Sequence, residues 1–229
     1  MAGPTAKVVP FGENAFLVVL GERISVPLNR RTHALDAAVR AELPAADGWG
    51  DPVPAYASLL VPFDPQRLDP DAAHERLEAV VAATGRLPPG PERGGRLVEI
   101  PVCYGGPDGP DLAEVAERLG MAPEAVVRAH AGRTYRVYLL GFVPGFAYLG
   151  TLPPRLVLPR RPTPRPAVPP GSVGIAAAQT AVYPVATSGG WHLIGRTDLP
   201  LWDPAADPPA RLAPGDRVRF VPVERPGPR

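Results

Sequence analysis

The 229-residue chain is long enough for one large domain or two small ones, and 45% of its residues are apolar, which suffices for a hydrophobic core. Its formal net charge of +1 gives no general attraction to nucleic acid. We expect neither a membrane-spanning helix nor a secretory signal, because no run of about 18 apolar residues is present and the first residues lack a continuous apolar segment.

Residues 7–20 contain two short apolar runs on either side of a Gly-Glu-Asn turn, which predicts a pair of strands. Pro10 has no amide hydrogen to donate, so the first strand is expected at a sheet edge. Helix, strand and helix patterns follow at 29–42, 56–63 and 70–84. Asn29 and Asp69 are the expected N-caps of the two helices. The order predicts a small open sheet with helices on one face.

A Pro-, Gly- and charge-rich stretch at 86–95 predicts a linker between an N-terminal domain over 1–90 and a C-terminal domain over 91–229. The second domain is expected to begin with a strand, two helices and a strong strand, at 97–102, 111–120, 123–130 and 133–142. Short apolar runs then recur about every 8–12 residues between Gly and Pro, which is typical of a β-barrel or sandwich. The predicted class is α+β, with an α/β first domain and a mostly β second one.

The segment 141–200 is basic in an otherwise near-neutral chain: it holds five arginines (Arg155, Arg160, Arg161, Arg165 and Arg196) against the single acidic residue Asp198. It is also rich in glycines and aromatic residues. Guanidinium groups bind carboxylate or phosphate, glycines let a ligand approach the backbone, and aromatic rings wall small-molecule pockets. The segment therefore predicts an anion-binding cleft at one mouth of the barrel. The alternative is a solvated arginine face with turn glycines.

Other residues with reactive side chains have structural interpretations as well. The Pro-rich stretch 159–171 predicts an extended, polyproline-like strap over the barrel. His130 is either a general base or a helix-end histidine that favours the helix dipole. Cys103, the only cysteine, permits no disulfide and fits a reducing cytoplasm. Lys7 is the only lysine, which excludes a Lys-containing phosphate loop, and no metal-ligand spacing is present, so no metal site is expected.

A series of short motifs occurs in order along the second half of the chain: 101–106 (PVCYGG), 109–112 (GPDL), 138–149 (YLLGFVPGFAYL), 159–161 (PRR), 163–165 (TPR), 171–173 (GSV), 179–180 (QT), 183–184 (YP), 189–191 (GGW), 194–197 (IGRT) and 214–216 (PGD). Together they closely resemble the bacterial 5-oxoprolinase B-subunit family. That family is also labelled allophanate hydrolase subunit 1 and includes a sporulation-kinase inhibitor. The resemblance is strong over 96–223 and looser over 7–85.

This resemblance implies a small α/β N-terminal domain followed by a cyclophilin-like β-barrel domain. It also implies cytoplasmic partners: the C subunit, which has a related barrel, and the A subunit, which is of the LamB/YcsF type. The 5-oxoprolinase complex opens 5-oxo-L-proline, a small carboxylate, to L-glutamate with ATP as co-substrate, and the isolated B subunit is expected to be inactive. Two other functions remain open: a regulatory protein that inhibits a histidine kinase, and a carboxyltransferase-like subunit of urea or allophanate metabolism.

Residue chemistry and motif membership together suggest a set of site residues. The expected substrate-binding residues are Phe146, Tyr148, Arg160, Arg161, Gln179, Thr180, Gly189, Gly190 and Trp191. The expected catalytic residues are His130, Arg165 and Arg196. The sequence departs from the resemblance at Thr187-Ser188, where a Ser-Pro is expected, and around Gln179, where alanines replace more polar residues.

Overall fold

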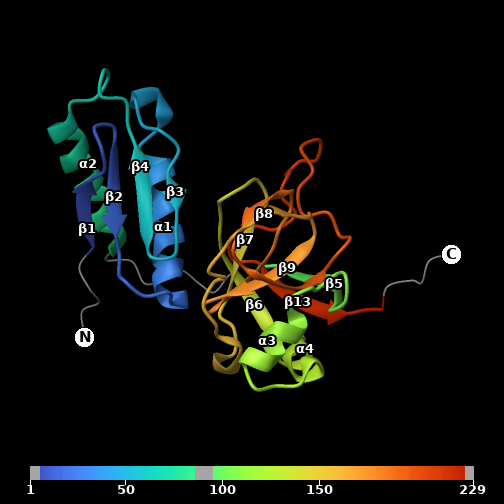
Figure 1. Cartoon of the computed structure of the whole chain (residues 1–229). Helices are drawn as coiled ribbons and strands as arrows, with labels where there is room; N and C mark the ends of the chain where they lie inside the picture. Colours follow the sequence, from blue (N-terminus) through green and yellow to red (C-terminus); the bar gives the residue numbers. More distant parts are fainter. Residues whose placement is uncertain (1–5, 86–94, 225–229) are drawn as a thin grey trace. The chain divides into compact units, whose positions relative to one another are not determined.

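The computed structural model describes residues 6–85 and 95–224, and the chain divides into two compact units, Met1–Arg93 and Gly94–Arg229 (Figure 1). The predicted linker at 86–95 lies, except for its last residue, outside the described residues, and so does the predicted boundary between residues 90 and 91. Each unit has its own hydrophobic core. The α+β class, with a barrel in the second unit, is confirmed.

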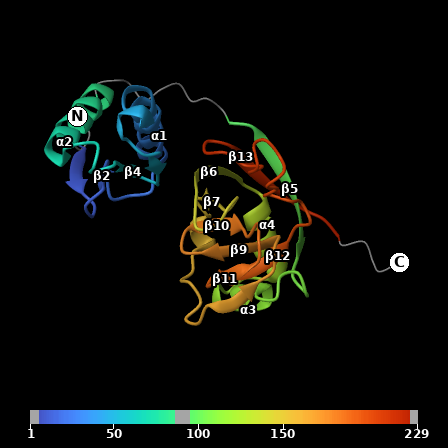
Figure 2. The same cartoon turned by 90° about the horizontal axis from the view of Figure 1, so that it is seen from above.

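The first unit is a four-stranded antiparallel sheet covered by two helices. Its elements are β1 (Lys7–Pro10), β2 (Ala15–Val19), α1 (Val26–Glu42), the 3-10 helix η1 (Ala45–Asp47), β3 (Val53–Pro54), β4 (Ser58–Pro62) and α2 (Pro70–Gly85). The strand order is β1-β2-β4-β3, so β1, with Pro10, lies at an edge as predicted. The two helices lie side by side (Figure 2).

Alternation along the strands explains why the helices cover one face. Phe16 and Val18 on β2 are buried, as are Leu59 and Val61 on β4, while the residues between them are partly exposed. In a strand, alternate side chains point to one face. The buried face packs against apolar residues of α1 and α2, such as Leu77. Burial of such a side chain stabilises the fold by about 1.5–3 kcal/mol.

The N-terminus of α1 differs from the prediction. The helix begins at Val26, not at Asn29, and its N-cap is Ser25, whose hydroxyl accepts a hydrogen bond from the amide of Leu28 at 3.3 Å. Pro27 stands in the first turn, where its missing amide hydrogen costs nothing. Asn29 is instead fully buried in the helix. By contrast, Asp69 caps α2 as predicted, accepting from two backbone amides at 3.0 and 3.1 Å.

The second unit is a closed barrel with one flanking strand pair. Its elements are β5 (Leu97–Tyr104), α3 (Leu112–Arg118), α4 (Pro123–Ala131), β6 (Thr134–Leu140), β7 (Ala147–Gly150), the 3-10 helix η2 (Pro154–Leu156), β8 (Arg165–Val168), β9 (Ser172–Ala176), β10 (Gln179–Val182), β11 (Thr187–Gly189), β12 (His192–Arg196) and β13 (Arg217–Pro222). The barrel order is β10-β7-β6-β13-β5-β12-β9, closed by β9 on β10. Only the pairing of β13 with β5 is parallel in the described part.

The barrel positions the candidate site in two ways. Apolar side chains, among them Val102, Val137 and Ile175, form a packed core in its interior. Helices α3 and α4 pack against each other and against the barrel (Figure 1). The strap at 159–171 was expected to have a polyproline-like conformation. Part of it forms the strand β8, which pairs with β11 outside the barrel. Pro166 is tolerated in this short strand because β8 has a partner on one side only.

Candidate functional site

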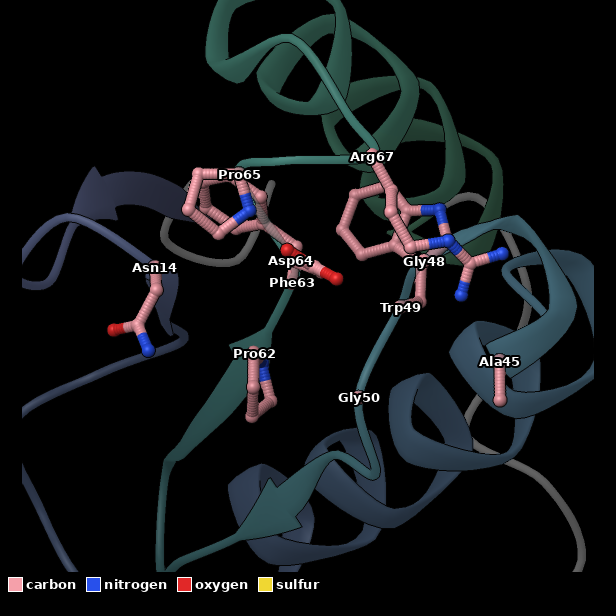
Figure 3. Close-up of a pocket in the computed structure, with 10 residues that line it drawn as sticks. All are labelled: Asn14, Ala45, Gly48, Trp49, Gly50, Pro62, Phe63, Asp64, Pro65 and Arg67. Carbon is pink, nitrogen blue, oxygen red and sulfur yellow. The ribbon is translucent and has the colours of Figure 1, made fainter.

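A cavity of about 390 Å³ lies in the first unit. Figure 3 shows its lining residues, with Asn14 on one side and Ala45 on the other. Its charged groups are already engaged in local structure: the Asp64 carboxylate accepts from the Gln66 amide at 2.9 Å, and the Arg67 guanidinium donates to a nearby backbone carbonyl. The charged groups of this cavity are therefore tied to the local fold, and its remaining polar side chains are Asn14 and Trp49, whose Nε1 has no partner among the described residues.

A second cavity, of about 220 Å³, lies in the second unit beside the barrel. It is lined by Phe142, Phe146, Tyr148, Arg160, Arg161, Pro164, Tyr183, Ser188, Gly189, Gly190 and Trp191. These residues come from the β6–β7 loop, from β7, from the strap before β8, and from the stretch between β10 and β12. Segments far apart in the chain thus converge on one hollow of the size of a small molecule.

Aromatic rings form one wall of this cavity. The ring of Phe146, which is 1% exposed, lies edge-on to those of Tyr148, Tyr183 and Trp191 at centroid distances of 4.9, 5.3 and 5.8 Å. Such edge-to-face pairs stabilise each other by about 0.5–1.5 kcal/mol beyond the area they bury. Phe142 completes the wall, with its ring 5.4 Å from that of Phe146 and still 58% exposed. The wall is therefore rigid at Phe146 and open at Phe142.

Two glycines bring the backbone into the cavity. A Cβ atom on Gly189 would stand 2.5 Å from the hydroxyl of Tyr183, so a side chain is excluded there. A Cβ atom on Gly190 would meet nothing closer than 3.8 Å. The backbone at Gly190 is fixed by its carbonyl, which accepts from the amide of Arg161 at 2.8 Å. Gly190 therefore leaves room for a ligand rather than for neighbouring protein atoms.

Arginines of the strap supply the charge. Arg161 donates to Asp111 at 3.2 Å and to Glu114 at 3.5 Å, and Arg165 donates to Asp111 at 2.6 Å. Arg160 makes no ion pair within 6–85 and 95–224 and is exposed on the cavity wall. Burial raises the pKa of the Tyr148 hydroxyl, and the positive charge of Arg160 opposes that rise.

Seven of the nine predicted substrate-binding residues line this cavity: Phe146, Tyr148, Arg160, Arg161, Gly189, Gly190 and Trp191. Thr180 does not, because its hydroxyl is buried inside the barrel and donates to the carbonyl of Gly174 at 3.1 Å. Gln179, half-buried on β10, lies outside the cavity lining as well.

The structure also places the three predicted catalytic residues outside the cavity lining. Arg165 lies beside it and is paired with Asp111. Arg196 is half-buried at the end of β12, and its Nε atom has no hydrogen-bond partner in the described part of the chain. His130 is fully buried in the barrel.

Both ring nitrogens of His130 are engaged. Its Nε2 is 2.9 Å from the Thr180 hydroxyl and its Nδ1 is 2.7 Å from the Tyr104 hydroxyl. Since Thr180 donates its proton to Gly174, it accepts from His130, which then accepts from Tyr104. Burial lowers the pKa of His130 to about 3. The imidazole is neutral, both its nitrogens are occupied, and it is not placed to take a proton from a ligand in this cavity.

Sequence reasoning missed Asp111, which holds two of the arginines. It is only 4% exposed, and its second carboxylate oxygen accepts from the amide of Leu193 at 2.7 Å. The one signal that pointed to it was its place in the motif at 109–112. Within the described ranges no cluster of three metal-ligating side chains exists, and no helix has both the length and the apolar character needed to cross a membrane.

Comparison with known proteins gives concordant matches. The family model described as carboxyltransferase domain, subdomain C and D, matches residues 6–212. A 5-oxoprolinase B subunit from Bacillus subtilis (strain 168) is 41% identical over 222 residues, covering 94% of this chain and 92% of its own length. The crystal structure of TTHA0988 matches this chain with a TM-score of 0.78 and 43% sequence identity. The match covers 94% of this chain and 41% of the TTHA0988 chain, so this chain spans about two fifths of the length of TTHA0988. The K. lactis urea amidolyase shares the fold, with a TM-score of 0.81 at 19% identity over 97% of this chain and 15% of that one.

Proposed function

Because the chain belongs to the 5-oxoprolinase B-subunit family, we propose that it is the B subunit of an ATP-dependent 5-oxoprolinase. Its partners in this proposal are the C subunit, with a related barrel, and the A subunit, of the LamB/YcsF type. The complex opens 5-oxo-L-proline to L-glutamate, and the isolated B subunit is inactive. The B. subtilis relative carries the name of the B subunit of this enzyme, and at 41% identity it matches nearly the whole chain.

The observation that carries the proposal is the aromatic and cationic cavity of the second unit. A volume of about 220 Å³ suits a single five-membered ring with its carboxylate. In this proposal the rings of Phe146, Tyr148 and Trp191, which line the cavity, pack against the substrate ring, and Gly190 leaves space beside it. Arg160 binds the carboxylate.

The chemistry explains why other subunits are part of the proposal. A lactam resists hydrolysis, and we assign its activation to phosphoryl transfer from ATP onto the lactam oxygen, which releases ADP. Water then adds to the activated carbon and the ring C–N bond breaks, with the proton going to the nitrogen. A second water hydrolyses the resulting acyl phosphate to glutamate and phosphate. Among the described residues that line the cavity, none offers a carboxylate or a neutral imidazole to act as a base. The proposal therefore gives this chain the binding and orientation of the substrate, with the base and the nucleotide contacts supplied by the assembled complex.

Co-expression with the A and C subunits tests the proposal. The expected result is ATP hydrolysis that depends on 5-oxo-L-proline, with release of glutamate, in the complex and not in the isolated chain. Arg160→Gln is expected to lower this activity at least about tenfold through the lost charged hydrogen bonds. The matched control is Arg128→Gln, the same change at an exposed residue of α4. The proposal is refuted if no combination of the subunits hydrolyses ATP in a way that depends on 5-oxo-L-proline.

The description of the matching family model favours carboxyl transfer as a second candidate. The same assay distinguishes the two functions, because the substrate can be replaced by urea and a biotin carboxylase added. Turnover with urea and none with 5-oxo-L-proline would favour the second candidate.

A further inference from the structure

The two arginines that line the cavity differ in their pairing. Arg161 is tied to Asp111 and Glu114, whereas Arg160, one residue earlier, has no acidic partner among the residues that the structure describes. Arg165, at the start of β8, is tied to the same Asp111 oxygen as Arg161. One buried carboxylate thus holds two arginines on the C-terminal side of Arg160.

Asp111 is itself fixed to the barrel. Its Oδ2 accepts from the amide of Leu193 at 2.7 Å, and its own amide donates to the carbonyl of Leu193 at 2.9 Å. With only 4% exposure it has little contact with water. A buried carboxylate needs such partners, because an unpaired buried charge is strongly unfavourable. Asp111 is therefore a rigid anchor for whatever it binds.

The strap that carries Arg160 is held on both sides of that residue. The carbonyl of Pro159 is 3.0 Å from Nε2 of His192, and the amide of Arg161 donates to Gly190 at 2.8 Å. Asp111 adds side-chain anchors at Arg161 and Arg165. The backbone of Arg160 thus has little freedom, which reduces the entropy lost when its guanidinium binds a ligand.

The charges determine what such a site accepts. Asp111 offsets part of the charge of Arg161 and Arg165, and Glu114 is shared between Arg161 at 3.5 Å and Arg118 at 3.4 Å. Arg160 is the arginine of the cavity that has no acidic partner among the described residues. A ligand with one negative charge is neutralised by Arg160, whereas a second negative charge would meet only arginines that are already paired with Asp111 or Glu114. The phosphates of a nucleotide carry several charges and do not fit this balance.

We propose that Asp111 is a positioning and specificity-determining residue: it withdraws Arg161 and Arg165 from ligand binding and leaves Arg160 to bind a ring compound with a single carboxylate. The inference rests on the proposed function of this cavity. It assigns Arg165 to holding the strap, in place of the catalytic role expected from the sequence.

Calorimetric titration of the full chain tests the inference with two probes: 5-oxo-L-proline, which has one carboxylate, and cyclopentane-1,2-dicarboxylate, which has two. The wild-type protein is expected to prefer the first. Asp111→Asn keeps the size and the bond from Leu193 but removes the charge. It is expected to shift the ratio of the two Kd values toward the dicarboxylate about five- to tenfold, because the probe with the additional negative charge gains more when the carboxylate beside Arg161 loses its charge. The matched control is Glu117→Gln, which removes one negative charge at an exposed position of α3. It is expected to shift the ratio of the two Kd values less than about twofold, because solvent and salt screen a charge at the surface.

A second comparison does not depend on the folding of the Asp111 variant. Arg160→Gln is expected to weaken binding of 5-oxo-L-proline at least about tenfold, and Arg165→Gln less than about threefold, because only the first removes a charged hydrogen bond to the ligand. If Arg165→Gln weakens binding as much as Arg160→Gln, or if Asp111→Asn leaves the ratio unchanged, the inference is overturned while the proposed function stands. If the wild-type chain binds neither probe while the assembled complex turns over 5-oxo-L-proline, the inference is overturned and the proposed function stands. If there is neither binding nor turnover, both proposals fail.

Discussion

The buried histidine of the barrel predicts a specific loss of stability in acid. His130 is fully buried, its ring is stacked on Phe220 at 4.5 Å, and burial lowers its pKa from 6.5 to about 3. Between these two pH values the unfolded chain binds a proton that the folded chain does not. The free energy of unfolding therefore falls as the pH drops below 6.5, by about 3 kcal/mol at pH 4.5.

The His130→Gln variant isolates this contribution from that of the other titrating groups. Glutamine does not titrate, and its amide offers one donor and one acceptor for Thr180 and Tyr104. The variant is less stable at pH 7, but we expect its stability to fall less between pH 7 and 4.5. Between pH 7 and pH 4.5 the wild-type protein should lose about 3 kcal/mol more of its free energy of unfolding than the variant does, because the pKa of His130 is lowered in the folded state.

Urea denaturation at the two pH values provides the measurement. The chain has two compact units, so their transitions must be separated. A Trp49→Phe background removes the tryptophan of the first unit and leaves Trp191 and Trp202 as reporters of the second. An equal loss of stability in both proteins between pH 7 and 4.5 would mean that His130 is not held neutral by burial, and the reasoning would be refuted.

Three further predictions concern local geometry in the second unit. Gly189→Ala is expected to cost about 1–3 kcal/mol of stability, because its Cβ would stand 2.5 Å from the Tyr183 hydroxyl. Gly190→Ala is expected to change the stability by less than about 0.5 kcal/mol. It is also expected to weaken ligand binding in a titration, because the added methyl group narrows the cavity. Phe142 has a φ of 76°, so Phe142→Gly is expected to be about 1 kcal/mol more stable than Phe142→Ala in thermal denaturation, since both lose the ring and only alanine keeps the unfavourable φ. Asp216, 4% exposed, accepts from two backbone amides at 3.0 Å, and Asp216→Ala is expected to cost about 3 kcal/mol in the same measurement, because both amides lose their partner.

Local patterns predicted the elements of the fold well where one signal dominated. The Asp69-Pro70 pair begins α2 as expected, and the apolar run at Ser172–Ala176 is a strand with those bounds. At α1 the predicted start is too late, because Asn29, the expected N-cap, lies buried within the helix, whereas Ser25 is the cap. The barrel order has no local signal, since β10 pairs with β7 and β13 with β5 through contacts between distant residues.

The candidate site was predictable in its composition and not in its charge. Aromatic, glycine and arginine residues within 141–200 were expected to meet, and seven of the nine predicted binding residues do. Thr180 does not line the cavity, because its side chain is buried inside the barrel, whereas Gln179, the other residue of its motif, is half-buried. Membership in a motif indicates a common fold constraint, and it does not say which of the two faces of a strand a residue occupies.

Counting charges within one segment leaves out the acidic residues that fold against that segment. The segment 141–200 carries five arginines and one aspartate, which suggested a strongly cationic cleft. Asp111 lies 50 residues before Arg161 in the sequence, yet its carboxylate contacts the guanidinium groups of Arg161 and Arg165. Charge pairs in a folded protein are set by the sheet that brings strands together, here by the contact of Asp111 with β12. The electrostatic field at a site therefore depends on neighbours in space, and Asp111 offsets part of the positive charge that the segment carries.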